Sequence, residues 1–233
     1  MSSILTIETS TSVCSSALSV DGKTEFEKAS FEGPSHAALL GVFIEEAVVR
    51  AKKKGIRLDA VAVSSGPGSY TGLRIGVSMA KGICFGYNIP LIAIPTLDIM
   101  AYKAIKETKQ PGDTLYCAML DARRMEVYAA IYDNKLNTVR PTLAEVVTAE
   151  TYSTLLEMNR ICFFGDGAAK CKKVITSANA LFIDNIVPLA GDMTALAHER
   201  FINNKFEDAA YFEPFYLKEF IATVPKNKVV FIP

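Results

Sequence analysis

Two stretches of the chain repeat one pattern, 113 residues apart at their first landmark. ILTIETSTSVCSSALSVDG and LYCAMLDARRMEVYAAIYDN are both typical of strand, turn, strand, turn. In each, an acidic residue ends the first strand, Glu8 and Asp121, and an Asp-led turn follows the second strand, at Asp21-Gly22 and Asp133-Asn134. A repeat of this length predicts two related lobes and not a solenoid, although any two β-hairpins share part of this pattern.

Strands alternate with helices along the chain, and this alternation predicts the α/β class. One helix is predicted over 35–54, with Ser35 as its N-cap and Gly55 as its stop. A second helix is predicted over 71–86, with Thr71 as its N-cap. Together with the repeat, the alternation indicates an actin/hexokinase-like (ASKHA, RNase H-like) fold of two related lobes, each with a mixed β-sheet flanked by helices.

Turn-forming residues at Lys109-Gln110-Pro111-Gly112 mark the expected boundary between the lobes. The predicted first lobe comprises residues 1–106, joined by the C-terminal segment 208–233, and the second lobe comprises residues 107–207. A third helix is expected to start at an N-cap Thr96. Later helices are predicted over 148–159, from Gly167 through Val174, and over 192–203.

The helix over 35–54 carries two apolar stripes, where one stripe is enough to hold a helix on its own sheet. The second stripe consists of Leu39, Val42 and Val49. It lies beside a first stripe of Leu40, Phe43, Ile44, Ala47, Val48 and Ala51. Two stripes predict a helix covered on both sides, either by a partner protein or by its own domain.

The helix over 71–86 has small residues on one face, since Gly72, Gly76 and Ala80 recur at every fourth position. Small residues at this spacing let another backbone approach closely, at about 1 kcal/mol of helix propensity per glycine. The preceding SGPGSYTG loop is interpreted as a tight strand-to-helix turn, with an anion cradle at the helix N-terminus as the alternative. The predicted partner interface comprises Leu39, Val42, Phe43, Glu46, Gly72, Leu73, Gly76, Val77 and Ala80.

The stretch SSGPGSYTGLRIGVSMAKGICFGYNIPLIAIPTLDIMA, residues 64–101, resembles the signature of the bacterial TsaB (YeaZ) family. The first hairpin, the hairpin DARRMEVYAAIY and the element PFYLKEF resemble the family too, with Lys218 where Arg is usual; residues 138–206 are weakly marked.

The resemblance implies a subunit without chemistry of its own. Such a subunit pairs through its N-lobe helices with the catalytic paralogue TsaD or, when alone, with a second copy. With the ATPase TsaE as third member, the complex transfers a threonylcarbamoyl group to N6 of adenosine 37 in tRNA. The resemblance therefore implies contact with tRNA only indirectly, through the complex.

Neither histidine lies in a metal-binding motif, since Leu40 stands at i+4 from His36 and His198 is far away in the sequence. Catalytic relatives hold a metal with an H-x-x-x-H pair, whose spacing places two imidazoles on one helix face. We therefore predict no metal ligands and no catalytic residues.

Nucleotide contacts are left open at two turns. Glu8, Thr9 and Ser10 follow the first strand without a glycine, which keeps the backbone away from a phosphate, whereas Gly165 and Gly167 permit a closer approach. No obligatory cofactor is predicted, and weak ATP or ADP binding stays open. The alternatives to a subunit role are an ASKHA-type ATPase or small-molecule kinase, and an M22-like metallopeptidase.

The chain carries 25 basic and 25 acidic residues, so it lacks the excess of basic residues that is typical of a protein that binds nucleic acid without a partner. Five cysteines without a CxxC pair favour a reducing cytoplasm. No apolar run approaches the roughly 20 residues of a membrane span, and no signal peptide is visible. We expect a cytoplasmic protein without a membrane partner, in which Arg123-Arg124 contacts a partner or RNA or is a solvated turn.

Overall fold

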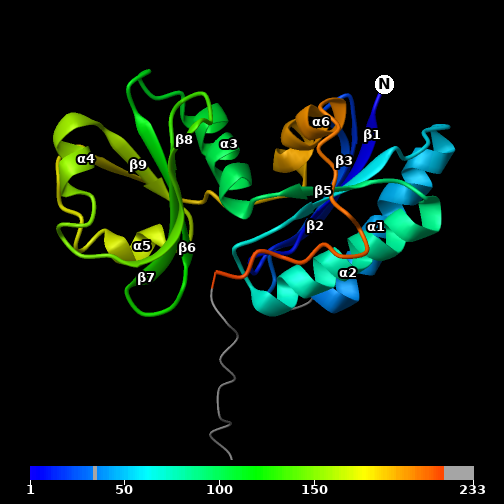
Figure 1. Cartoon of the computed structure of the whole chain (residues 1–233), viewed down its shortest axis with the longest axis horizontal. Helices are drawn as coiled ribbons and strands as arrows, with labels where there is room; N and C mark the ends of the chain where they lie inside the picture. The colour runs from blue at the N-terminus through cyan, green and yellow to red at the C-terminus, as the bar shows by residue number, and fades with distance from the viewer. Residues whose placement is uncertain (34–35, 218–233) are drawn as a thin grey trace, which may run out of the picture.

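The computed structural model describes residues 1–33 and 36–217, which form two lobes side by side (Figure 1). A five-stranded sheet in the order β3-β2-β1-β4-β5 forms the middle of the first lobe. β1 pairs antiparallel with β2 and parallel with β4, so the first strand of the chain is central. The strands are β1 (Ser3–Glu8), β2 (Cys14–Val20), β3 (Lys23–Ser30), β4 (Ala60–Ser64) and β5 (Leu91–Ile94).

The second lobe repeats this topology in a sheet of order β8-β7-β6-β9-β10. Its central strand β6 is likewise antiparallel to β7 and parallel to β9. Glu8 and Asp121 end the two central strands, as predicted. The strands are β6 (Leu115–Asp121), β7 (Glu126–Tyr132), β8 (Thr138–Val146), β9 (Ile161–Phe164) and β10 (Ala180–Ile183). The shared strand order confirms the predicted duplication and the ASKHA fold.

Helices cover both faces of the first sheet (Figure 1). α1 (His36–Lys53) and α2 (Tyr70–Tyr87) enclose the larger core with one face, and α6 (Thr194–Ile202) encloses a smaller core with the other. The alternating burial of α1 explains the arrangement, because its first apolar stripe, from Leu40 to Ala51, is the side that packs on the sheet.

The two predicted helices of the first lobe are confirmed within one residue at each end. Pro34 and Ser35, the latter being the expected N-cap of the first helix, lie outside the described residues. α2 is capped by Ser69 and not by Thr71, because Ser69 Oγ accepts a hydrogen bond from Gly72 N at 3.2 Å.

The packing of two helices places the boundaries between the lobes at positions other than the predicted residues 106 and 207. α3 (Thr96–Thr108) lies on the second sheet, where Leu97, Met100 and Ala104 share a core with residues of β6, β7 and β9. α6 and the short 3-10 helix η1 (Gly191–Met193) return to the first lobe instead. Each lobe therefore contains a helix that the order of the sequence would assign to the other lobe.

The remaining helices of the second lobe are shorter than predicted. α4 (Ser153–Met158) and α5 (Ala168–Cys171) pack on the face of the sheet opposite α3, as Figure 1 shows. The strands β8 and β10 were not predicted from the sequence. β8 contains Pro141, which is tolerated because β8 is an edge strand, and β10 is only four residues long.

Polar contacts join the lobes where α3 meets α6 and η1. Asp98 of α3 accepts a hydrogen bond from Tyr132 Oη at 2.7 Å and lies 3.9 Å from the guanidinium of Arg200 on α6. Lys103 of α3 forms an ion pair with Asp192 of η1 at 3.1 Å. Burial raises the pKa of both Asp98 and Asp192.

The segment after α6 crosses the first lobe, as the orange trace in Figure 1 shows. Glu207 N donates to Leu91 O at 2.9 Å, and Phe215 N donates to Ser65 O at 2.7 Å. Up to residue 217, this segment therefore contacts the first lobe; Lys218 and the following residues lie outside the described part. No helix in residues 1–33 and 36–217 has both the length and the apolarity that crossing a membrane requires.

Candidate functional site

Exposed apolar side chains gather on the sides of α1 and α2 that face away from the sheet. Phe85 is 91% exposed, Val42 is 49% exposed and Val49 is 40% exposed. Exposed or half-buried positions recur at alternating spacings of four and three residues on both helices, the spacing by which helices pack on other helices. We call this surface the outer helix face; it comprises Ala38, Val42, Glu45 and Val49 of α1, and Thr71, Ile75, Ser78, Gly82 and Phe85 of α2.

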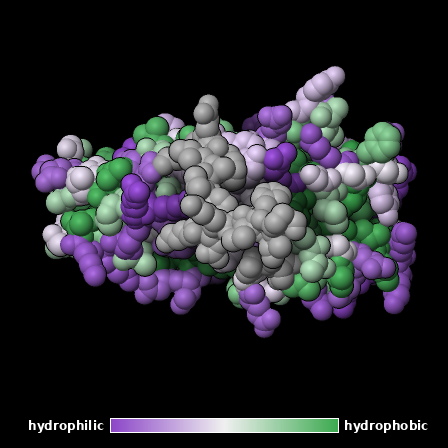
Figure 2. Space-filling view, turned by 90° about the horizontal axis from the view of Figure 1, so that it is seen from below, coloured by the Kyte–Doolittle hydropathy of each residue, from purple (hydrophilic) through white to green (hydrophobic). Residues whose placement is uncertain are grey.

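A groove of about 560 Å³ runs between the two helices within the outer helix face. Ala37 and Gly41 line it from α1, and Ile75 and Met79 line it from α2. Figure 2 looks onto the molecule from the side of α2, and green, apolar residues appear on the half that holds α1 and α2, with purple ones at its margin. The exposed surface of the two helices thus mixes apolar side chains such as Val42 and Phe85 with polar ones such as Glu45 and Ser78.

Glycines on α2 fall into two classes that differ in what surrounds them. A Cβ atom on Gly72 would lie 2.1 Å from Thr9 O, and one on Gly76 would lie 2.3 Å from Thr9 Oγ1. A Cβ atom on Gly82 or Gly86 would meet no atom within 4 Å. The open glycines are therefore those near the C-terminal end of α2, beside Phe85.

The predicted interface is corrected accordingly. The close approach expected at Gly72, Gly76 and Ala80 is made by Thr9 of the same chain and by the sheet, not by a partner helix. Phe43, Leu73, Val77 and Ala80 are also buried in this chain and offer almost no surface. The other predicted positions keep exposed surface: Val42 is exposed, Leu39 is half-buried, and Glu46 is half-buried with a 3.3 Å ion pair to Lys28.

The turn that follows β1 is buried and hydrogen-bonded within the described part of the chain. Glu8, Thr9 and Ser10 are fully buried, and Glu8 Oε1 accepts hydrogen bonds from Ser10 N at 2.6 Å and Ser10 Oγ at 2.5 Å. Ser10 O accepts from Ser69 N at 2.6 Å. The backbone N–H of Ser10, a donor that a phosphate would need, is therefore already bonded inside the fold.

The second turn predicted to approach a nucleotide is closed as well. A Cβ atom on Gly165 would lie 2.2 Å from Met119 O, and one on Gly167 would lie 2.8 Å from the carbonyl carbon of Leu120. These glycines let the turn pack on β6, so their role is the ordinary structural one. Beside them, Asp121 forms an ion pair with Lys170, which holds the pKa of Asp121 below its usual range although partial burial opposes this.

The candidate metal and nucleophilic side chains are inside the protein. His36 Nε2 lies 2.9 Å from Thr11 O, and Leu40, not a second histidine, stands one turn later. Within the described residues, no three His, Cys, Asp or Glu side chains are placed to hold a metal ion. All five cysteines are buried and free, and burial raises the pKa of Cys14 and Cys84 to about 11.

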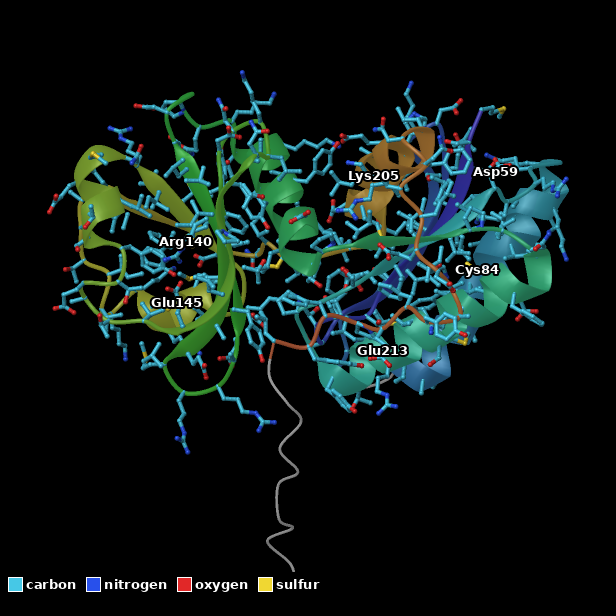
Figure 3. The ribbon with its side chains drawn as sticks, viewed as in Figure 1. Asp59, Cys84, Arg140, Glu145, Lys205 and Glu213 are labelled. Atoms are coloured by element: carbon cyan, nitrogen blue, oxygen red, sulfur yellow. The ribbon has the colours of Figure 1, made fainter. Side chains whose placement is uncertain are left out.

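The C-terminal segment forms the edge of the outer helix face. Tyr216 packs against Tyr70 with ring centroids 4.9 Å apart, and Arg74 donates to Tyr70 Oη at 2.7 Å. Lys81 donates to Ala210 O at 3.1 Å, and Glu213 lies on this segment beside α2 (Figure 3). The segment thereby covers the flank of α2 and leaves its outer side exposed.

Comparison with known proteins assigns the family. A family model described as "TsaD: tRNA N6-adenosine threonylcarbamoyltransferase" matches residues 31–230. The chain is 30% identical over 225 residues to the "tRNA threonylcarbamoyladenosine biosynthesis protein TsaB" of Haemophilus influenzae, covering 92% of this chain and 93% of that protein. The chain belongs to the TsaB (YeaZ) family.

Two further relatives agree with this placement. The TsaB protein of Escherichia coli is 29% identical over 227 residues, covering 94% of this chain and 96% of that protein. A crystal structure from Pseudomonas aeruginosa, of a protein described as similar to the peptidase YeaZ, is 25% identical, with a TM-score of 0.78 over 94% of this chain and 100% of that one. The resemblance in the sequence is therefore confirmed, and TsaB proteins are named for the biosynthesis of threonylcarbamoyladenosine in tRNA.

In this TsaB-family chain, three residues of the outer helix face lie outside the predicted partner interface. Ile75, Gly82 and Phe85 were not among the predicted contacts, although their four-three spacing with Thr71 and Ser78 is present in the sequence. α2 contains one glycine pair at a spacing of four residues on its inner side, Gly72 and Gly76, and another near its C-terminal end, Gly82 and Gly86, so the glycine spacing alone favours neither side.

We predict that Gly76→Ala and Gly82→Ala change stability in opposite directions. The first substitution forces Thr9 to shift in a packed core, and we expect it to lower the free energy of unfolding by about 2 kcal/mol or more. The second meets no atom and relieves the low helix propensity of glycine, so we expect a gain of up to about 1 kcal/mol. Urea unfolding of the two variants measures both, and equal effects would contradict the assignment of the inner face.

Glu8 makes the stability of the chain depend on pH. Burial raises the pKa of Glu8 from 4.5 to about 7, against opposing hydrogen bonds from Ser10 and contributions from Ser64 and Thr9. Since the folded pKa lies above the unfolded one, the folded state holds this proton more tightly. The stabilisation is complete below pH 4.5 and is lost as the pH rises through about 7.

We therefore predict that the wild-type chain loses on the order of 3 kcal/mol of unfolding free energy, relative to Glu8→Gln, from about pH 5 to about pH 8. Urea unfolding at a series of pH values measures the difference between the two proteins. A pH dependence that is the same with and without the carboxyl group would show that Glu8 does not titrate in this range.

Proposed function

We propose that the chain is a non-catalytic subunit of the machinery that forms threonylcarbamoyladenosine at position 37 of tRNA. Its task is to bind and activate a TsaD-like transferase through the outer helix face. The observation that carries the proposal is the exposed apolar surface of α1 and α2, with Phe85 91% exposed beside two glycines that have open space around them. A surface of this kind on a soluble partner of an enzyme is typical of an interaction site.

The occupant that fits this surface is a paralogue with the same lobe. The model of the TsaD transferase family matches most of this chain, so a TsaD-like protein has α1 and α2 helices of its own to place on the groove. Two helices from each protein would then bury the apolar side chains that recur at spacings of four and three residues on both partners. A second copy of this chain is the occupant when the paralogue is absent.

The buried state of the chemically active groups supports a subunit without chemistry. Glu8 is enclosed by the fold, His36 contacts a backbone carbonyl, and the cysteine thiols are protonated at neutral pH because burial raises the pKa of those such as Cys14 and Cys84. The transferase chemistry is therefore assigned to the partner. A TsaE-like ATPase is the third component, and tRNA is reached through the complex, in the cytoplasm.

We predict that Val42→Glu and Phe85→Glu each weaken binding to the TsaD-like paralogue by about 100-fold, because each would bury a charge in the apolar middle of the interface. Calorimetric titration of the two purified proteins measures the affinity. The content of threonylcarbamoyladenosine in tRNA from cells that depend on each variant measures the function.

A matched control is Val139→Glu, which changes a valine of similar exposure (47%) on β8 of the other lobe. This variant should bind like the wild type. If Val42→Glu and Phe85→Glu bind the paralogue as tightly as Val139→Glu does, docking does not use the outer helix face. Reconstitution with and without the chain then decides whether the paralogue needs it at all.

A further inference from the structure

Glu8 lies on neither docking helix, yet its carboxylate is connected to the first turns of both. The link to α2 consists of two steps. Glu8 Oε1 accepts hydrogen bonds from Ser10 N at 2.6 Å and Ser10 Oγ at 2.5 Å. Ser10 O then accepts from Ser69 N at 2.6 Å, and Ser69 is the residue that caps α2.

The link to α1 runs through the same turn. Thr11 O lies 2.9 Å from Nε2 of His36, the first residue of α1 and a buried side chain. Thr9, on the other side of Ser10, touches α2 at Gly72 and Gly76. The turn from Thr9 to Val13 therefore lies between the starts of the two docking helices, and Glu8 fixes its middle.

A carboxylate at this position lowers the stability of the fold, so its presence there needs an explanation. Glu8 is fully buried, and its Oε2 atom has no hydrogen-bond partner among the described residues. The groups that face it are the Cys14 thiol from β2 and the hydroxyls of Ser10 and Ser64, none of which is a cation. On α2, the backbone of Gly72 and Gly76 lies against Thr9 of this turn. Burying such a group without a counter-charge costs stability, which favours a role in positioning.

We propose that Glu8 is a positioning residue for the outer helix face: its carboxylate holds the Thr9–Val13 turn, and this turn sets the starts of α1 and α2 relative to each other. The inference deepens the proposed function and rests on it for the docking readout. In this chain the acidic residue at the end of the first strand thus serves the interaction surface and not a nucleotide.

The test compares Glu8→Ala with Glu8→Gln in the full-length chain. Glu8→Ala removes the acceptor, and we expect at least tenfold faster hydrogen exchange at the amides of Ser69 and Gly72, with at least tenfold weaker binding to the TsaD-like paralogue. Glu8→Gln keeps an acceptor oxygen of the same reach, and we expect it to restore both values to within about threefold of the wild type.

Thr6→Val is the matched control, because it removes a buried hydroxyl from the same strand. Thr6 Oγ1 lies 2.8 Å from Ala190 O and 3.3 Å from Ala17 O, which are both outside the Thr9–Val13 turn, so this variant should lose stability without changing either readout. Exchange is measured under conditions where all variants are folded. Should Glu8→Ala not fold, Ser10→Ala carries the same two measurements, since it removes the hydroxyl that Glu8 binds.

The proposal is overturned if Glu8→Ala exchanges like the wild type at Ser69 and Gly72, or if Thr6→Val shows the same losses as Glu8→Ala. It is also overturned if exchange accelerates while the affinity stays unchanged. If the wild-type chain itself binds no paralogue and no second copy, the proposed function fails, whereas the exchange data still report whether Glu8 holds the turn.

Discussion

The contact between the turn after β1 and the backbone of α2 is the constraint on which the rest of the molecule depends. A Cβ atom at Gly68, Gly72 or Gly76 would come within 2.1–2.3 Å of an atom of Thr9 or Ser10. Only glycine permits this approach, so the SGPGSYTG loop and the inner side of α2 are shaped by a contact within the chain. The contact brings β1 and α2 together at the end of the sheet where the acidic residue Glu8 stands.

Two functional consequences follow from this one contact. The turn that would otherwise be open to a phosphate is filled by the chain itself, with Glu8, Thr9 and Ser10 fully buried. The inner sides of α1 and α2 are occupied by the sheet, so the helices can offer a partner only their outer sides. Phe85 and Val42 remain exposed there.

Local patterns in the sequence predicted most of the fold, because strand alternation and the Asp-led turns are short-range signals and the whole pattern recurs 113 residues later. Two helices were placed with the wrong lobe, since α3 and α6 each pack on the sheet that is more distant along the chain. Gly76 and Gly82 illustrate why the buried and the exposed side of α2 were harder to predict. The residue that distinguishes them is Thr9, whose contact with Gly76 joins positions far apart in sequence, and no helical periodicity contains that information.

Hydroxyl-radical footprinting of the chain, free and bound to the TsaD-like paralogue, tests the central claim most directly. Phe85 and Met79 should lose most of their reactivity on binding, because the partner would cover the groove and its end. Met158, which is 75% exposed on α4 of the second lobe, should stay reactive and serve as the internal reference. Unchanged oxidation of Phe85 and Met79 in the complex, with protection elsewhere, would contradict docking through the outer sides of α1 and α2.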